Sequence, residues 1–132
     1  MIMANTILIV ENSEIVVSKL KNLLGGIENL DIIGNASDSY AAVNMIRQYK
    51  PDYVILDLSL NLGHGLKVLE EISVMKKVPY VIVLTNLNYQ YYKDKCLKLG
   101  ARHFFDKAME FEKVYDILSA DTEVKSTELE VE

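Results

Sequence analysis

The stretch "YVILDLSLNLGHG", residues 53–65, carries the main clue to the fold. It opens with four apolar residues, as a strand buried on both faces does, and the carboxylate of Asp57 follows directly. Two glycines, Gly63 and Gly65, then break the pattern, as they do in a turn. An acidic side chain at this point either terminates a core strand or is held there for its chemistry.

The same kind of apolar run recurs along the chain of 132 residues. The five runs are "TILIV" (6–10), "LDIIG" (30–34), "YVIL" (53–56), "YVIVL" (80–84) and "HFF" (103–105). The segments between them carry apolar residues at helical spacing, most clearly over residues 16–27. Strands alternating with helices predict an α/β fold: one (βα)5 doubly wound, flavodoxin-like domain with a parallel sheet in the order 2-1-3-4-5.

Turn and capping residues agree with this division. Ser13 and Ser37 are expected helix N-caps, and Gly100 lies where the fourth helix should end. The domain is predicted to occupy residues 1–119. Residues 120–132 are predicted to form a flexible acidic C-terminal tail, with a continued fifth helix as the alternative.

The charge distribution argues against direct nucleic-acid binding. The net charge is −5, and residues 119–132 hold five acidic residues and one lysine, so the remainder is nearly neutral.

No apolar run is long enough to span a membrane, and the N-terminus lacks the features of a signal peptide. The single cysteine, Cys96, has helical spacing typical of a core position. We therefore expect a cytoplasmic protein.

Polar side chains follow four of the predicted strands. Glu11 and Asn12 come after the first strand, Asp57 after the third, Thr85 after the fourth and Lys107 after the fifth. The carboxyl ends of parallel strands share one edge of the sheet, where ligands bind, so these side chains should converge.

This set of side chains suits phosphoryl transfer. Carboxylate and carbonyl oxygens are ligands for Mg²⁺, and a carboxylate such as Asp57 can be the nucleophile that forms an aspartyl phosphate. Lys107 and the Thr85 hydroxyl can hold the other oxygens of the phosphoryl group. Thr85 alone is also explained as an ordinary strand residue, and Asn12 as a turn or helix cap.

Four motifs, "ILIVEN", "VILDLSLNLGHGL", "VIVLTN" and "GARHFFDK", resemble in order and spacing those of response-regulator receiver domains of two-component signalling. The resemblance covers residues 5–119 and is closest in kind to stand-alone, chemotaxis-type receivers. It implies that Asp57 is the phosphoacceptor, with Thr85 as the switch hydroxyl and Lys107 as the phosphate-pairing lysine. It also implies a Mg²⁺ site. The implied ligands are Glu11, Asn12, Asp57 and the backbone carbonyl of Ser59.

The sequence departs from the family pattern at several of these places. Asn12 replaces an acid, which predicts weaker Mg²⁺ binding, since affinity depends on ligand charge. Asn61 and Ala108 replace prolines. Phe104 replaces a switch tyrosine and lacks its hydroxyl.

The predicted fourth helix offers candidate contact residues. Tyr89 and Tyr92 share its apolar stripe and are expected to pack inward, whereas Tyr91 is expected to be exposed. Tyr91 and Phe104, with the fourth helix, fifth strand and fifth helix, form the expected partner face. His64 is expected to be a solvated loop residue.

The resemblance implies a single-domain response regulator. It would take a phosphoryl group from a sensor histidine kinase or phosphotransfer protein and act through an unknown downstream protein. It would be a monomer or weak homodimer, and no enzyme beyond its own phosphorylation and dephosphorylation. The alternative is a phosphorylation-independent receiver-like scaffold, which Asn12 motivates. A flavin or nucleotide enzyme is disfavoured, because "VENSE" stands where a glycine-rich phosphate loop would follow the first strand.

Overall fold

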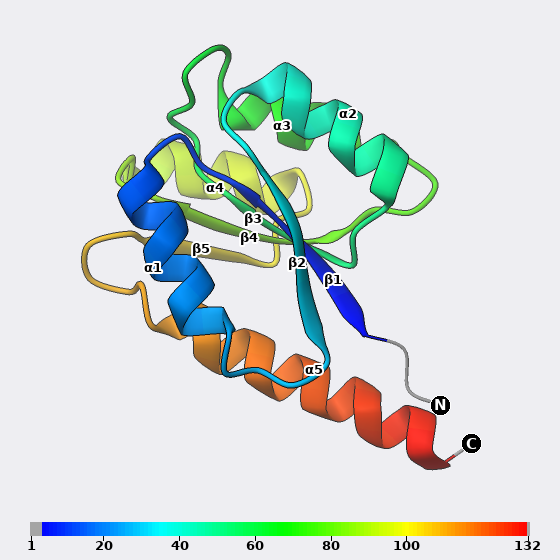
Figure 1. Cartoon of the computed structure of the whole chain (residues 1–132). Coiled ribbons are helices and arrows are strands. Elements are labelled where there is room, and N and C mark those ends of the chain that lie inside the picture. Colours follow the sequence, from blue (N-terminus) through cyan, green and yellow to red (C-terminus); the bar gives the residue numbers. More distant parts are fainter. Residues whose placement is uncertain (1–3, 132) are drawn as a thin grey trace.

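The computed structural model describes residues 4–131 and contains five strands that alternate with five helices (Figure 1). In chain order these are β1 (Asn5–Val10), α1 (Glu14–Leu24), β2 (Leu30–Ala36), α2 (Ser39–Tyr49), β3 (Tyr53–Leu56), α3 (Gly65–Ile72), β4 (Tyr80–Thr85), α4 (Gln90–Lys98), β5 (His103–Asp106) and α5 (Lys113–Val131). All strand pairs are parallel, in the order β2-β1-β3-β4-β5. The predicted fold class and strand order are confirmed.

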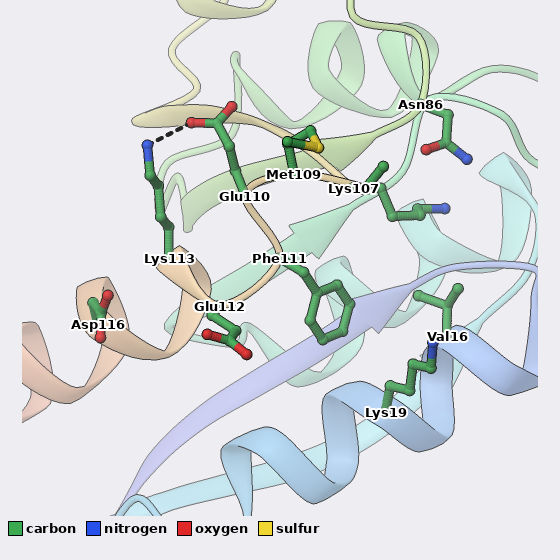
Figure 2. A pocket seen from close by; sticks show the side chains of 11 residues that line it. Val16, Lys19, Asn86, Lys107, Met109, Glu110, Phe111, Glu112, Lys113 and Asp116 are labelled. Carbon is green, nitrogen blue, oxygen red and sulfur yellow. Dashed lines mark hydrogen bonds and ion pairs between the residues drawn. The ribbon is translucent and has the colours of Figure 1, made fainter.

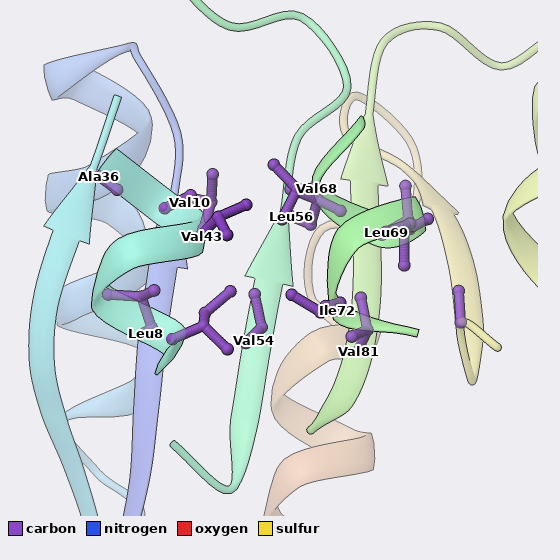
Figure 3. Packing of buried hydrophobic residues seen from close by; sticks show 14 of the residues in the cluster. Leu8, Val10, Ala36, Val43, Val54, Leu56, Val68, Leu69, Ile72 and Val81 are labelled. Carbon is purple, nitrogen blue, oxygen red and sulfur yellow. The ribbon is translucent and has the colours of Figure 1, made fainter. Parts of the chain in front are cut away.

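The three central strands are buried on both faces, so the residues of each apolar run are divided between two hydrophobic clusters, one on each face of the sheet. Leu8, Val54 and Val81 belong to the cluster that α2, α3 and α4 cover, part of which Figure 3 shows. Ile7 and Ile55, which point the other way, belong to the cluster under α1 and α5. Because successive strand residues face opposite sides, a continuous apolar run fills both layers. The central strands are therefore anchored on both faces up to their last residues.

Helix caps explain where several elements begin and end. Ser13 caps α1, as predicted, by accepting a hydrogen bond from the backbone N–H of Val16. The predicted cap at Ser37 is wrong: Asp38 caps α2, and its carboxylate accepts from the Ala41 N–H at 2.8 Å. A carboxylate is at least as good a cap as a hydroxyl, and it also interacts favourably with the helix dipole.

The fifth helix corrects the prediction of a flexible tail from residue 120. Helix α5 continues without a break to Val131, which agrees with the alternative. Asp121 accepts a hydrogen bond from the buried Tyr53 hydroxyl, and the ammonium of Lys125 lies 4.5 Å from the centre of the Tyr53 ring. Thr122 is buried as well. These contacts join residues 121–125 to the sheet, although their composition is that of a solvated segment.

Residues 1–3 of the predicted domain and residue 132 of the predicted tail lie outside the described residues. Within the described part of the chain, no helix has the length and apolar character needed to cross a membrane.

Candidate functional site

Two carboxylates are delivered side by side by neighbouring strands. Strands β1 and β3 pair in register, with Val10 opposite Leu56, so the residues that follow them, Glu11 and Asp57, are also neighbours. The Asp57 N–H donates to the Val10 carbonyl at 2.9 Å, which extends the ladder by one residue. Both carboxylates thus start from backbone that the core strands hold rigidly.

Lys107 directly follows the edge strand β5 and bridges the two carboxylates. Its backbone N–H donates to the Thr85 carbonyl at 2.9 Å, which fixes it beside the end of β4. Its Nζ donates to Glu11 Oε1 at 2.5 Å and to Asp57 Oδ2 at 2.9 Å. The exposed fractions of the three side chains are 13%, 2% and 5% in that order. The predicted convergence of Glu11, Asp57 and Lys107 is what the structure shows.

Burial changes the ionisation of this cluster. Burial raises the pKa of Glu11, and the adjacent Asp57 adds to this effect, while the bond to Lys107 opposes it. For Lys107, burial alone would lower the pKa, but the hydrogen bonds to Glu11 and Asp57 outweigh it, and the pKa is raised. Lys107 is therefore a firmly protonated cation at neutral pH.

The loop after β3, residues 57–64 (the β3–α3 loop), packs closely on itself. The Ser59 N–H lies 3.3 Å from Asp57 Oδ1, and the Gly65 N–H donates to the Leu58 carbonyl at 2.9 Å. A Cβ at Gly65 would lie 2.4 Å from the Asp57 carbonyl oxygen, closer than any real contact. Only glycine allows α3 to begin this close to the Asp57 backbone.

The oxygen donors beside Asp57 fit a hard divalent cation. Glu11, Asp57, the Ser59 carbonyl and the Asn12 amide oxygen are ligand types that Mg²⁺ prefers. Within the described residues, no three Asp, Glu, His or Cys side chains are grouped to hold a metal, so the carbonyl and amide would have to contribute.

The Asn12 amide can itself form hydrogen bonds to two of these oxygens. In one orientation of the amide, Nδ2 donates to Asn61 Oδ1 at 3.1 Å. In the swapped orientation, which satisfies both atoms of the amide, Nδ2 donates to the Ser59 carbonyl at 3.1 Å and to Glu11 Oε2 at 3.2 Å. A cation that uses those two oxygens must displace this N–H₂ group. The geometry thus adds a second reason, beside the lost charge, for the predicted weak Mg²⁺ binding.

Of the predicted switch residues, Thr85 lies beside Lys107, whose backbone N–H donates to the Thr85 carbonyl. Thr85 is fully buried, and its hydroxyl accepts a hydrogen bond from the Leu87 N–H at 3.2 Å, in the β4–α4 loop. Phe104 is half-buried and packs against the core cluster under α4. Tyr91 is 65% exposed, as predicted, but Tyr89 is equally exposed, which contradicts its predicted packing role. Tyr89 is the N-cap of α4, in extended backbone, so helical spacing does not apply to it.

The β5–α5 loop is held without the family's proline. The Ala108 N–H donates to Asp106 Oδ1 at 2.9 Å, a bond that proline cannot make, and no cis peptide bond is found in the described residues. This bond lowers the pKa of Asp106. A cavity of about 720 Å³ lies beside this loop. Figure 2 shows its lining side chains, which include Lys107, Asn86 and residues of α1. The cavity therefore borders Lys107 but neither of the two carboxylates that Lys107 contacts.

The predicted role of His64 as a solvated loop residue is also wrong. It is half-buried rather than solvated, and its Nδ1 accepts a hydrogen bond from the Leu66 N–H at 3.1 Å, which caps α3. Its ring also stacks on Tyr92 of α4, with ring centres 5.6 Å apart. The sequence carries no clear signal for this role, because histidine is not among the preferred N-cap residues.

Comparison with known proteins shows which family the sequence matches. The family model for the response regulator receiver domain matches residues 7–119. The chain is 27% identical over 117 residues to the chemotaxis protein CheY of Halobacterium salinarum, covering 89% of this chain and 96% of that protein. It is 31% identical to a protein-glutamate methylesterase/protein-glutamine glutaminase of Shewanella oneidensis, but spans only 30% of that protein.

Solved structures show the same fold. The response regulator domain of Thermotoga maritima CheB superposes with a TM-score of 0.77 at 25% identity, covering 89% of this chain and 92% of that one. The Mn²⁺-bound form of response regulator Rcp1 superposes with a TM-score of 0.75 at 22% identity, covering 88% and 90%.

Proposed function

Because the chain belongs to the response regulator receiver domain family, we propose that it is a phosphorylation-controlled switch of two-component signalling. A sensor histidine kinase or a phosphotransfer protein supplies the phosphoryl group in the cytoplasm, and Asp57 accepts it. The chain acts on no separate substrate and catalyses at most its own phosphorylation and dephosphorylation. The Mn²⁺-bound relative supports a divalent cation at the acidic edge, and we assign Mg²⁺ to Glu11, Asn12, Asp57 and the Ser59 carbonyl.

The observation that carries this proposal is the bridge from the Lys107 ammonium to the Glu11 and Asp57 carboxylates. An Asp57 oxygen attacks the phosphorus of the phosphohistidine, a P–O bond forms, the P–N bond breaks, and the imidazole leaves with the bonding pair. Bound Mg²⁺ would neutralise the charge on the phosphoryl oxygens. Lys107, freed from Asp57 Oδ2, pairs with one of those oxygens, and the rigid ends of β1 and β3 hold the nucleophile in place.

The switch would act through the end of β4. A phosphorylated Asp57 is larger and more negative than the carboxylate, so the Thr85 hydroxyl turns from Leu87 to donate to it. Phe104 then moves toward the space that Thr85 leaves. We propose that the face of α4, β5 and α5, including the exposed Tyr91, shifts between two packings and changes its affinity for a downstream protein.

One observation favours a second candidate function, a scaffold that binds partners without phosphorylation. In its swapped orientation, the Asn12 amide donates hydrogen bonds to the Ser59 carbonyl and to Glu11 Oε2, two of the oxygens assigned to the cation. A pocket of this kind would keep its shape with neither metal nor phosphoryl group.

Titration with Mg²⁺ and beryllofluoride, a phosphoryl mimic that binds to carboxylates, separates the two functions. For a switch, the amide resonances of residues 57–62 and 85–98 shift, and the shifts vanish in Asp57→Asn. For a scaffold, neither region responds at any Mg²⁺ concentration up to tens of millimolar, and binding of a partner is the same for both proteins.

A further inference from the structure

His64 lies where the β3–α3 loop meets helix α4. Toward the loop, His64 pairs with Ser59 in an isolated antiparallel bridge, and its Nδ1 accepts from the Leu66 N–H at 3.1 Å. The next residue, Gly65, packs directly on the Asp57 carbonyl. His64 is therefore fixed to the same short segment of backbone that carries Asp57.

Toward α4, the imidazole lies almost parallel to the Tyr92 ring, with an interplanar angle of 24° and ring centres 5.6 Å apart. Tyr92 is half-buried against the core cluster of α2, α3 and α4. Its ring also contacts both exposed tyrosines, with ring centres 5.4 Å from Tyr91 in an edge-on arrangement and 6.2 Å from Tyr89. One stacked contact thus separates the Asp57 loop from the aromatic surface of α4.

We propose that His64 is a positioning residue that ties the β3–α3 loop to α4, so that the loop and the exposed tyrosines Tyr89 and Tyr91 move together. The stack is a second connection between Asp57 and α4, separate from the Thr85–Leu87 hydrogen bond at the end of β4. Energetic coupling of this kind is reciprocal, so a substitution on α4 should affect the loop and a substitution in the loop should affect α4. The use of this link in signalling rests on the proposed phosphorylation of Asp57, but the link itself does not.

Three substitutions separate the parts of this contact. His64→Asn keeps a side-chain acceptor that can cap α3 and removes the ring. His64→Phe keeps a ring for stacking and removes the cap. Tyr92→Leu removes the ring on α4 and retains an apolar side chain. Tyr40→Leu, an exposed tyrosine of α2, is the matched control.

Hydrogen exchange of single amides tests the link without any ligand. In Tyr92→Leu, the Gly65 and Leu66 amides, which bond within the β3–α3 loop, should exchange at least about fivefold faster than in wild type. In His64→Asn, the Tyr92 and Lys93 amides, both bonded to the Tyr89 carbonyl, should accelerate similarly, whereas His64→Phe should leave them unchanged. Unchanged exchange in both Tyr92→Leu and His64→Asn, or equal acceleration in Tyr40→Leu, would overturn the proposal.

Beryllofluoride adds the signalling readout. In His64→Asn, binding at Asp57 should keep its affinity within about twofold, while the response of the α4 amides falls by at least about half. A full α4 response in this variant would refute the role of His64 in transmission. If wild type does not bind beryllofluoride at all, the proposed phosphorylation fails, and the exchange experiment still decides whether the link exists.

Discussion

Asn12 sets the charge and the hydrogen bonding of the acidic edge beside Asp57. The residue that the family pattern reserves for an acid is here a neutral amide, whose N–H₂ group bonds to Glu11 and to the Ser59 carbonyl. The loss of charge was visible in the sequence. The competing hydrogen bonds were not, because they depend on how the β1–α1 and β3–α3 loops meet in space.

Asn12→Asp should therefore raise the affinity for Mg²⁺ by about tenfold, since affinity follows the number of charged ligands and the competing amide hydrogens are removed. Titration calorimetry measures the affinity directly. Asn22→Asp, which adds the same charge on the exposed face of α1, is the control. Equal affinities for wild type and Asn12→Asp would show that Asn12 does not limit metal binding.

Lys107 balances two buried carboxylates, so its removal should be costly. Lys107→Met should lower the free energy of unfolding by about 3 kcal/mol, the range for breaking a buried ion pair from one side. The exposed Lys113, which pairs with Glu110, provides the control, and Lys113→Met should change stability by less than about 0.5 kcal/mol. Urea denaturation at pH 7 measures both, and similar small losses would argue against a tightly paired cluster.

At the scale of elements, the close start of α3 against β3 shapes the site. Strand and helix boundaries followed from apolar runs and their spacing, because those patterns reflect which faces are buried. The predictions for Ser37, Tyr89 and His64 were wrong for a different reason. Each residue lies at a helix end, where one hydrogen bond or one extended residue decides the environment and periodicity carries no information.

Gly65→Ala tests the close approach of α3 to Asp57. The added Cβ would lie 2.4 Å from the Asp57 carbonyl oxygen and 2.7 Å from Leu58 Cα, and both are backbone atoms that cannot move aside cheaply. We expect a loss of about 2–3 kcal/mol in unfolding free energy. A Cβ at Gly26 meets nothing within 4 Å, so Gly26→Ala should be within about 0.5 kcal/mol of wild type. Equal effects at the two glycines would mean that the α3 start is not tightly packed.

At the scale of the whole molecule, the last helix is part of the domain. The acidic composition after residue 119 suggested a solvated tail, and local composition could not reveal that Asp121 has a partner in β3. The Tyr53 hydroxyl is that partner, almost seventy residues earlier in the chain. Long-range pairs of this kind depend on the fold and are not visible in a single sequence.

The buried Tyr53 hydroxyl, which donates to Asp121, should make the free energy of unfolding depend on pH in the alkaline range. Burial, reinforced by Asp121, raises the pKa of Tyr53 above its ordinary value of about 10. Above pH 10 the unfolded chain therefore loses the Tyr53 proton while the folded protein keeps it, and the free energy of unfolding falls as the pH rises. In Tyr53→Phe, no side chain at this position loses a proton in this pH range, so this contribution to the pH dependence is absent. The variant should be less stable than wild type by about 2 kcal/mol at pH 8, and the gap should shrink as the pH passes 10. A gap that does not change between pH 8 and 11 would contradict the assignment.

Phosphorylation of Asp57 can be measured by the intact mass of the protein after incubation with acetyl phosphate and Mg²⁺. Wild type should yield a species heavier by one phosphoryl group, which should be absent in Asp57→Asn and should form faster in Asn12→Asp at low Mg²⁺. A wild-type protein that stays unmodified with acetyl phosphate and with a phosphorylated histidine kinase, at every Mg²⁺ concentration, would contradict the proposed phosphorylation of Asp57.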